Sequence, residues 1–235
     1  MTEPALSLHF SDPQCGLSVS ARSGATLLFE GASSTALPDG PAVERDGDGW
    51  RAELADTLSV RFEPVAATAE LDGVSAHFCA VRGDVGGREV DCLGTLAETR
   101  SSPSWDELDA LRSITALFDR DNAFLAIGRR PRGALGHNEE RTTAWLLSAG
   151  EVVPVEDARI STVYDGEGRQ RSAGLELWLP DEDYALRGAG TVVAGSSLQF
   201  EGVDVHAAVF RWRMEDREGT GSYELMARAL EPQAA

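Results

Sequence analysis

The sequence predicts an all-β protein in which antiparallel strands follow one another as a meander and close into a barrel or a sandwich. Turn signals rich in glycine, aspartate and proline recur roughly every ten residues, a spacing typical of such folds. Residues 46–49 and 83–87 are examples. Apolar and polar residues alternate between these turns, which places them on opposite faces of a strand. Helical patterns are missing between the expected strands, and this excludes a parallel α/β fold.

Strands are expected wherever the alternation is sustained. Leu58, Val60 and Phe62 share one face of a clear example, and residues 74–80 and 203–209 repeat the pattern. A pattern with two distinct faces indicates antiparallel strands joined by hairpin turns.

One segment carries a helical signal, residues 104–112. Ser104 is a candidate N-cap, and Glu107 stands three residues later, as in a capping box. The segment follows a Ser-Ser-Pro stretch near the middle of the chain. We therefore expect it to join an N-terminal β-domain, residues 1–103, to a C-terminal β-domain, residues 104–235, unless both halves form one continuous β unit.

The charge excludes several classes of partner. Thirty-nine acidic residues stand against 21 basic ones, all of them arginine, and the formal net charge is −18. Nucleic acid binding needs a basic surface that displaces counterions from phosphate, and anionic lipid repels an acidic protein. We expect neither a nucleic acid partner nor a membrane partner. Without lysine the chain also lacks a Walker phosphate loop and Schiff-base chemistry.

Targeting and metal signals are missing from the sequence as well. The N-terminus lacks the basic and apolar regions of a signal peptide, and no apolar run approaches the ~20 residues of a membrane helix. A cytoplasmic location is expected. Cys15, Cys79 and Cys92 show neither the number nor the spacing of a disulfide framework or a zinc site, so we expect buried free thiols. No metal and no cofactor are predicted.

Two expected strands combine an aliphatic face with a mixed aromatic and ionisable face. In one strand, Glu176 and Trp178 lie opposite three leucines; in the other, His206, Phe210 and Trp212 lie opposite valines and an alanine. One face of a barrel strand lines the lumen, and an aromatic wall with a few polar groups suits a small-molecule pocket. The mixed faces are therefore predicted to line one cavity. The alternative is a solvent-facing surface or a packing layer between half-barrels.

The ionisable side chains of this cavity have candidate catalytic roles. Glu176 is predicted to be the general acid if the cavity is dry enough to keep it protonated, with His206 as its proton partner. Trp178, Phe210 and Trp212 are predicted to bind the ligand.

The remaining histidines lie in a loop and in two other strands. His137, Glu139 and Glu140 are predicted to contact the ligand at the rim of the cavity, because loops on a rigid scaffold concentrate function. A solvated run of charges is the alternative for this loop. His9 and His77 lie opposite the apolar faces of their strands and are expected to be solvated or hydrogen-bonded sheet positions.

From Trp105 onward the order of features is similar to that of a known family. A Ser-Trp-Asp joint at residues 104–106 is followed by an aromatic hairpin at 116–125, a Gly-His pair at 136–137, an Ala-Trp pair at 144–145, and finally Gly219, Gly221 and Glu224. This pattern resembles the lipocalin-like superfamily of carotenoid 1,2-hydratases (hydroxyneurosporene synthases) and AttH-like proteins. The resemblance implies one lipocalin-like barrel or two tandem lipocalin-like half-barrels, with no cofactor.

The resemblance also implies an apolar ligand, isoprenoid- or polyketide-like. The expected function is binding of such a molecule in a β-barrel cavity, alone or with cofactor-free acid–base hydration, isomerisation or cyclisation. That chemistry needs a carboxyl with a raised pKa, or a histidine, in a water-poor cavity. The alternative is a non-catalytic structural or protein-interaction module whose sheet edge binds a partner. None of these patterns encodes the oligomeric state.

Overall fold

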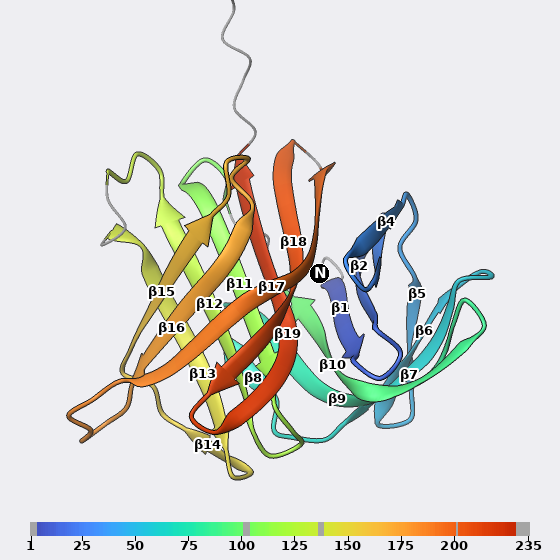
Figure 1. Cartoon of the computed structure of the whole chain (residues 1–235), viewed down its shortest axis with the longest axis horizontal. Helices are drawn as coiled ribbons and strands as arrows, with labels where there is room; N and C mark the ends of the chain where they lie inside the picture. Colours follow the sequence, from blue (N-terminus) through green and yellow to red (C-terminus); the bar gives the residue numbers. More distant parts are fainter. Residues whose placement is uncertain (1–3, 101–103, 136–138, 201, 229–235) are drawn as a thin grey trace, which may run out of the picture.

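The fold consists of two curled antiparallel sheets that lie side by side (Figure 1). The computed structural model describes residues 4–100, 104–135, 139–200 and 202–228, which form nineteen β-strands and no α-helix. The predicted all-β fold of tandem lipocalin-like half-barrels is confirmed. The described part of the chain offers no helix with the length and hydrophobicity to span a bilayer.

The N-terminal half-barrel has the strand order β4-β3-β2-β1-β10-β9-β7-β6-β5, with β8 paired to β9. Its longest hairpin joins β9 to β10 through Gly86 and Gly87, whose φ angles of 61° and 81° are those that a tight two-residue turn requires. The strands are β1 (Ala5–Asp12), β2 (Leu17–Arg22), β3 (Ala25–Glu30), β4 (Ser33–Leu37), β5 (Ala42–Asp46), β6 (Gly49–Leu54), β7 (Leu58–Pro64), β8 (Ala69–Leu71), β9 (Val74–Val85) and β10 (Arg88–Thr99).

The C-terminal half-barrel has the order β14-β13-β12-β11-β19-β18-β17-β16-β15, and β13 contacts β15 where the sheet curls round. Its strands are β11 (Leu108–Leu117), β12 (Ala123–Pro131), β13 (Arg141–Ser148), β14 (Glu151–Val153), β15 (Asp157–Tyr164), β16 (Gln170–Trp178), β17 (Leu186–Phe200), β18 (Val203–Met214) and β19 (Arg217–Arg228). The division of the chain into two domains stays a prediction.

The predicted helix at residues 104–112 is wrong. The Glu107 N–H donates to the Ser104 carbonyl (2.9 Å) and closes a turn, and strand β11 begins at Leu108. This strand pairs with β12 on one side and β19 on the other. Pairing on both sides satisfies its backbone and buries Ile114, which a short surface helix would not do.

Each half-barrel has its own interior core, formed by every second residue of its strands. Phe10, Phe62 and Leu96 are fully buried in the N-terminal core, and Phe124 and Tyr223 in the C-terminal one. The outer faces of the central strands then pack against the other half-barrel. These strands are therefore buried on both faces, which is unusual for an antiparallel sheet.

Two apolar patches hold the half-barrels together. In the first, Phe78 of β9 stacks on Trp145 of β13 with ring centroids 5.0 Å apart. In the second, Leu27 and Phe29 of β3 pack with Val209 of β18 and its neighbours. Polar residues fill the space between these patches.

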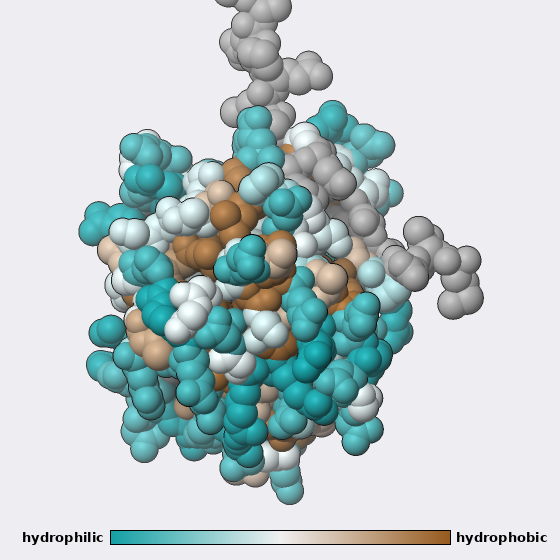
Figure 2. All heavy atoms as spheres, turned by 90° about the vertical axis from the view of Figure 1, so that its right-hand side faces the viewer, coloured by the Kyte–Doolittle hydropathy of each residue, from teal (hydrophilic) through white to brown (hydrophobic). Residues whose placement is uncertain are grey.

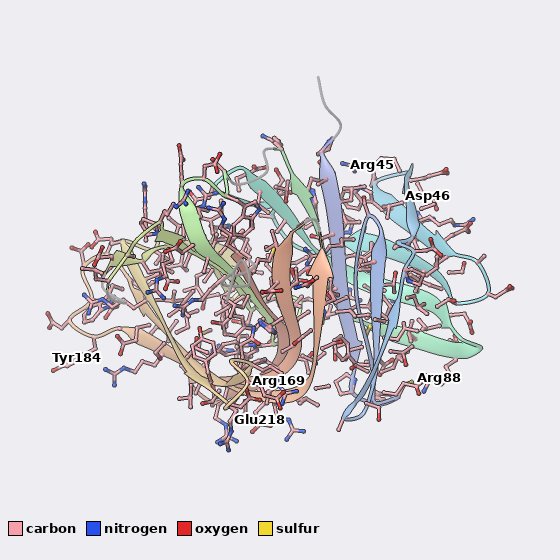
Figure 3. All side chains as sticks on the ribbon, turned by 90° about the horizontal axis from the view of Figure 1, so that it is seen from above. Arg45, Asp46, Arg88, Arg169, Tyr184 and Glu218 are labelled. Atoms are coloured by element: carbon pink, nitrogen blue, oxygen red, sulfur yellow. The ribbon has the colours of Figure 1, made fainter. Side chains whose placement is uncertain are left out.

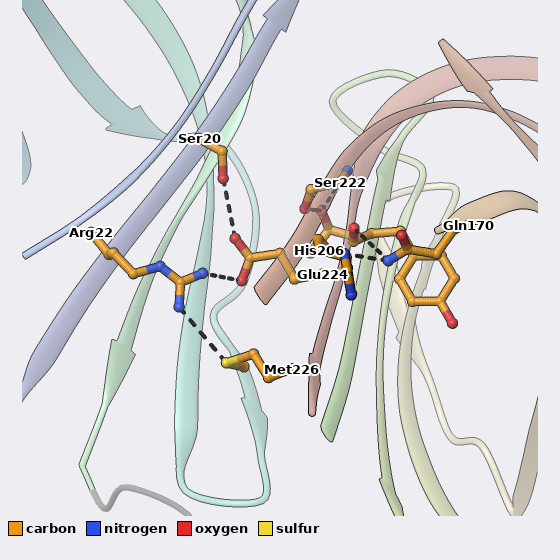
Figure 4. A network of polar contacts seen from close by, with 9 residues as sticks. Ser20, Arg22, Gln170, His206, Ser222, Glu224 and Met226 are labelled. Carbon is orange, nitrogen blue, oxygen red and sulfur yellow. Dashed lines mark hydrogen bonds and ion pairs between the residues drawn. The ribbon is translucent and has the colours of Figure 1, made fainter. Parts of the chain in front are cut away.

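A half-buried ion pair lies in that polar region and joins the two sheets (Figure 4). The Arg22 guanidinium of β2 binds the Glu224 carboxylate of β19, which also accepts from the Ser20 hydroxyl (3.2 Å). Burial by itself raises the pKa of Glu224. The charge of Arg22 and the hydrogen bonds from Arg22 and Ser20 outweigh that effect and hold the pKa below its ordinary value.

Two glycines let β19 approach β11 closely. A Cβ on Gly221 would lie 1.8 Å from the Thr115 carbonyl oxygen, and one on Gly219 would lie 2.3 Å from the Leu117 carbonyl oxygen. Together with Glu224, these are the residues of the closing strand that suggested the family. In this structure each of the three has a structural role.

The three cysteines are free. Cys79 is buried as predicted, and burial raises the pKa of its thiol to about 12. Cys92 is half-buried. The prediction is wrong for Cys15, which is exposed because it lies in the turn between β1 and β2.

Removing one partner of the Arg22–Glu224 pair is expected to destabilise the protein strongly. Glu224→Gln leaves the half-buried guanidinium without a counter-charge, and the free energy of unfolding in urea should fall by about 2 kcal/mol. The double variant Arg22→Met/Glu224→Leu removes both charges and should retain most of the stability. Equal losses in the single and double variants would show that the uncompensated charge is not the cause.

Candidate functional site

The predicted aromatic wall fills the C-terminal half-barrel. Phe210 and Trp212 are fully buried in its lumen, as the mixed face of β18 predicted. The Trp212 ring lies 5.5 Å from that of Phe210 and edge-on to Phe124 at 5.2 Å. This part of the lumen is packed with rings.

The predicted partners Glu176 and Trp178 lie on the other side of their sheet. In β16 it is Leu175 and Leu177 that enter the core with Trp212, so Glu176 and Trp178 point away from the lumen. Glu176 forms an ion pair with Arg187 at 3.1 Å. The expectation that all five residues share one cavity is therefore wrong. Alternation identifies two faces but does not tell which one is inside.

The other predicted site residues, His206 and the loop residues Glu139 and Glu140, lie toward the end of this half-barrel that is opposite Trp178 and Trp212. His206 shares the face of Phe210, is half-buried, and its Nδ1 lies 2.6 Å from the Ser197 hydroxyl. His137 lies outside the described residues. Glu139 is exposed and accepts a hydrogen bond from the Leu135 N–H (3.1 Å).

Glu140 belongs to a buried polar cluster inside the same end. It pairs with Arg112 of β11, and both side chains are at most 5% exposed. Arg112 Nη1 also contacts the Thr162 hydroxyl (3.3 Å), which lies 2.7 Å from the Tyr223 hydroxyl. Burial raises the pKa of Tyr223, so this phenol stays protonated. The cluster fixes the chain before β13 over the barrel end.

The N-terminal half-barrel contains a cavity, lined by both apolar and polar residues, that the sequence did not reveal. Its volume is about 210 Å³. Leu6 and Leu8 of β1, Val43 of β5 and Leu96 of β10 supply aliphatic walls, and Arg22 lies at its edge. Apolar side chains also gather in the middle of the outer side of this half-barrel, among hydrophilic ones (Figure 2).

Ionisable and aromatic side chains form a cluster around His77 of β9. The His77 ring packs on Trp50 with centroids 4.4 Å apart, and its Nδ1 lies 3.2 Å from the Thr68 hydroxyl. Its Nε2 lies 3.9 Å from Glu98 Oε1. Arg45 stacks over Trp50 at 3.9 Å and lies 3.6 Å from the same carboxylate. Seen from above, Arg45 lies on the N-terminal half-barrel (Figure 3).

Strand pairing places this cluster beside the cavity. His77 is the cross-strand partner of Leu96, and Glu98 is the partner of Leu6. Directly paired residues point to the same face of a sheet. Leu96 and Leu6, which line the cavity, therefore lie on the same face of the sheet as His77 and Glu98 and directly beside them. We call the cavity and this pair together the mouth site.

The electrostatics of the mouth site favour a neutral imidazole. Burial lowers the pKa of His77, the charges of Glu98 and Glu70 oppose this shift, and the charge of Arg45 reinforces it. A neutral histidine is a proton acceptor, and a nearby carboxylate stabilises the imidazolium that forms when it takes a proton. The site can therefore accept and return a proton next to a cavity with aliphatic walls.

Sequence reasoning expected both strand histidines to be solvated or hydrogen-bonded, because each lies opposite an apolar face. His77 is hydrogen-bonded as expected, through its contact with the Thr68 hydroxyl, while its ring packs on Trp50 inside the N-terminal half-barrel. The expectation is wrong for His9, which is 5% exposed between the half-barrels and has no hydrogen bond of normal geometry within the described residues. The missed signal is a histidine in an apolar strand. Both faces of such a strand are buried in this fold, so the histidine is buried as well.

No metal centre accompanies these groups. Within the described residues, no three His, Cys, Asp or Glu side chains gather closely enough to hold a metal ion.

Comparison with solved structures shows which known protein has the same fold. Two packed antiparallel half-barrels form a hydratase-like barrel fold. Kievitone hydratase from Nectria haematococca has this fold, with a TM-score of 0.61 over 96% of this chain and 89% of that chain at 9% identity. A DUF3598-family protein of unknown function from Nostoc punctiforme covers 97% of this chain and 94% of its own at 10% identity, with a TM-score of only 0.18.

Sequence comparison adds no relative. No family model matches the chain, and no curated protein matches it. The predicted resemblance is thus supported at the level of a hydratase-like barrel fold, while membership of the carotenoid hydratase superfamily stays a prediction.

The pKa of His77 should respond in opposite directions to its two charged neighbours. Glu98→Gln removes a charge that raises the pKa of His77 and should lower it; Arg45→Met removes a charge that lowers it and should raise it. An NMR titration of the imidazole resonances measures both shifts, with His206 as an internal control. Shifts of the same sign would contradict the geometry of the cluster.

Proposed function

We propose that the mouth site binds a small apolar molecule and adds water across an activated carbon–carbon double bond. The observation that carries this proposal is a cavity of about 210 Å³ in which two lining residues, Leu96 and Leu6, are the cross-strand partners of His77 and Glu98. Aliphatic walls with a few convergent polar groups are typical of small-molecule sites. The shared fold with a protein named as a hydratase supports the reaction class.

The reaction follows from the neutral state of His77. The imidazole takes a proton from water while the water oxygen bonds to the carbon remote from the activating carbonyl. The imidazolium then returns that proton to the neighbouring carbon, so that H and OH are added and His77 is regenerated. Glu98 stabilises the imidazolium, and Arg45 supplies a donor for the developing enolate oxygen.

Three alternative functions are isomerisation, simple ligand binding and a purely structural role, and each requires different features of the site. Isomerisation uses the same proton transfer without water, and simple binding uses only the cavity. A purely structural role accounts for the ring-filled C-terminal lumen but gives no reason for an open cavity beside an acid–base pair. We therefore favour hydration.

Cyclohexenone is a probe of suitable size and chemistry for the mouth site. It is expected to shift the amide NMR signals of His77 and Leu96 and to yield the hydrated ketone, detected by mass spectrometry. Val43→Phe fills the cavity and should abolish both effects, whereas His77→Gln should spare binding and abolish hydration.

The matched control is Val152→Phe, which places the same ring on an exposed edge strand of the other half-barrel. It should bind and hydrate like the unchanged protein. Binding that survives Val43→Phe would locate the ligand elsewhere, and hydration that survives His77→Gln would remove the histidine from the reaction.

A further inference from the structure

A small polar chamber lies between the half-barrels, beside the ion pair of Arg22 and Glu224. Its volume is about 50 Å³, and strands of both sheets contribute to it. Six hydroxyl-bearing residues, His9 and Glu224 line it, together with five aliphatic residues. A chamber so rich in polar groups between two packed sheets needs a physical explanation, because unpaired polar groups are costly to bury.

His9 is the side chain that most requires a partner there. It is 5% exposed, and within the described residues neither ring nitrogen has a hydrogen bond of normal geometry. Burial lowers the pKa of His9 to about 4, against the opposing effects of the Glu224 charge and the Val19 backbone. The ring is therefore neutral near neutral pH, with one donor and one acceptor to satisfy.

Water is the ligand whose size and chemistry fit the chamber. A buried water occupies at least ~10–15 Å³ of such space, so there is room for about three. Each buried water makes two to four hydrogen bonds, and the hydroxyls around His9 supply them. Glu224 repels an anion, Arg22 repels a cation, and the volume is too small for an organic molecule of ordinary size.

The chamber adjoins the cavity of the mouth site. Ser7 and Leu8 line both spaces. Arg22 lies at the edge of the cavity and binds Glu224, which lines the chamber. Figure 4 shows how the side chains of Arg22, Ser20 and Glu224 reach one another across the boundary between the sheets.

We propose that the chamber holds a cluster of ordered water and supplies the water molecule that is added at the mouth site. The second part rests on the proposed function. A ligand that fills the aliphatic cavity excludes bulk solvent from that side. Water passing Ser7 reaches the double bond from the chamber, gives its proton to His77 and its oxygen to carbon, and is replaced from the cluster.

Magnetic relaxation dispersion of water, which counts buried molecules that exchange slowly, tests the first part. Ala97→Leu adds apolar volume to the chamber wall and should remove about three slowly exchanging waters, a number set by the chamber volume. Ser113→Leu fills the chamber from the other half-barrel and should do the same if Ala97→Leu folds poorly. Ala36→Leu, on an exposed strand, should remove none. An unchanged count in both filled variants would mean a dry chamber and would overturn the inference.

Ser7→Leu tests the supply of water. It should lengthen the residence time of the buried water and slow hydration. Because Ser7 also lines the cavity, the hydration rate is compared at equal occupancy by cyclohexenone, which the amide shifts of His77 and Leu96 measure. An unchanged residence time and an unchanged rate would overturn the supply role while leaving the hydrated chamber standing. The unaltered protein could bind cyclohexenone without hydrating it and still show about three slowly exchanging waters. That result would overturn the proposed function and leave the hydrated chamber standing.

Discussion

The packing of two curled sheets through their outer faces is the constraint on which the rest of this structure depends. Each central strand must satisfy a barrel interior on one face and a second sheet on the other. In β1, Phe10 enters the core and His9 enters the boundary between the half-barrels. Polar groups in that boundary need partners from the opposite half. Arg22 and Glu224 provide such a partnership, and it fixes the lateral position of β2 relative to β19.

This constraint also separates the parts that can hold a ligand from those that cannot. The aromatic rings around Trp212 fill the C-terminal lumen, and the Arg112–Glu140 pair occupies its polar end. In the N-terminal half-barrel a cavity remains near the start of β1. The sheet that bounds this cavity also places His77 and Glu98 beside its lining residues Leu96 and Leu6.

Much of the fold was predictable, because period-two alternation and regular turns report directly on strands. The helix at residues 104–112 was wrong, since a capping box is a local signal and β11 is stabilised by pairing with a strand a hundred residues later. The site was harder to predict. Glu176 and His206 have similar surroundings in the sequence, yet β16 and β18 turn opposite kinds of face inward. Only the pairing of strands decides that orientation.

The pairing of β11 with β19 sets the order in which the molecule is completed during synthesis. Every strand partner in the N-terminal half-barrel lies before residue 100, so this half can form while the remainder is still being made. The strand β11 has β12 beside it early but waits for the last strand of the chain on its other edge. Until β19 emerges, Arg22 stands on a finished sheet without its carboxylate. The final strand thus closes the second half-barrel and adds the ion pair with the first in one event.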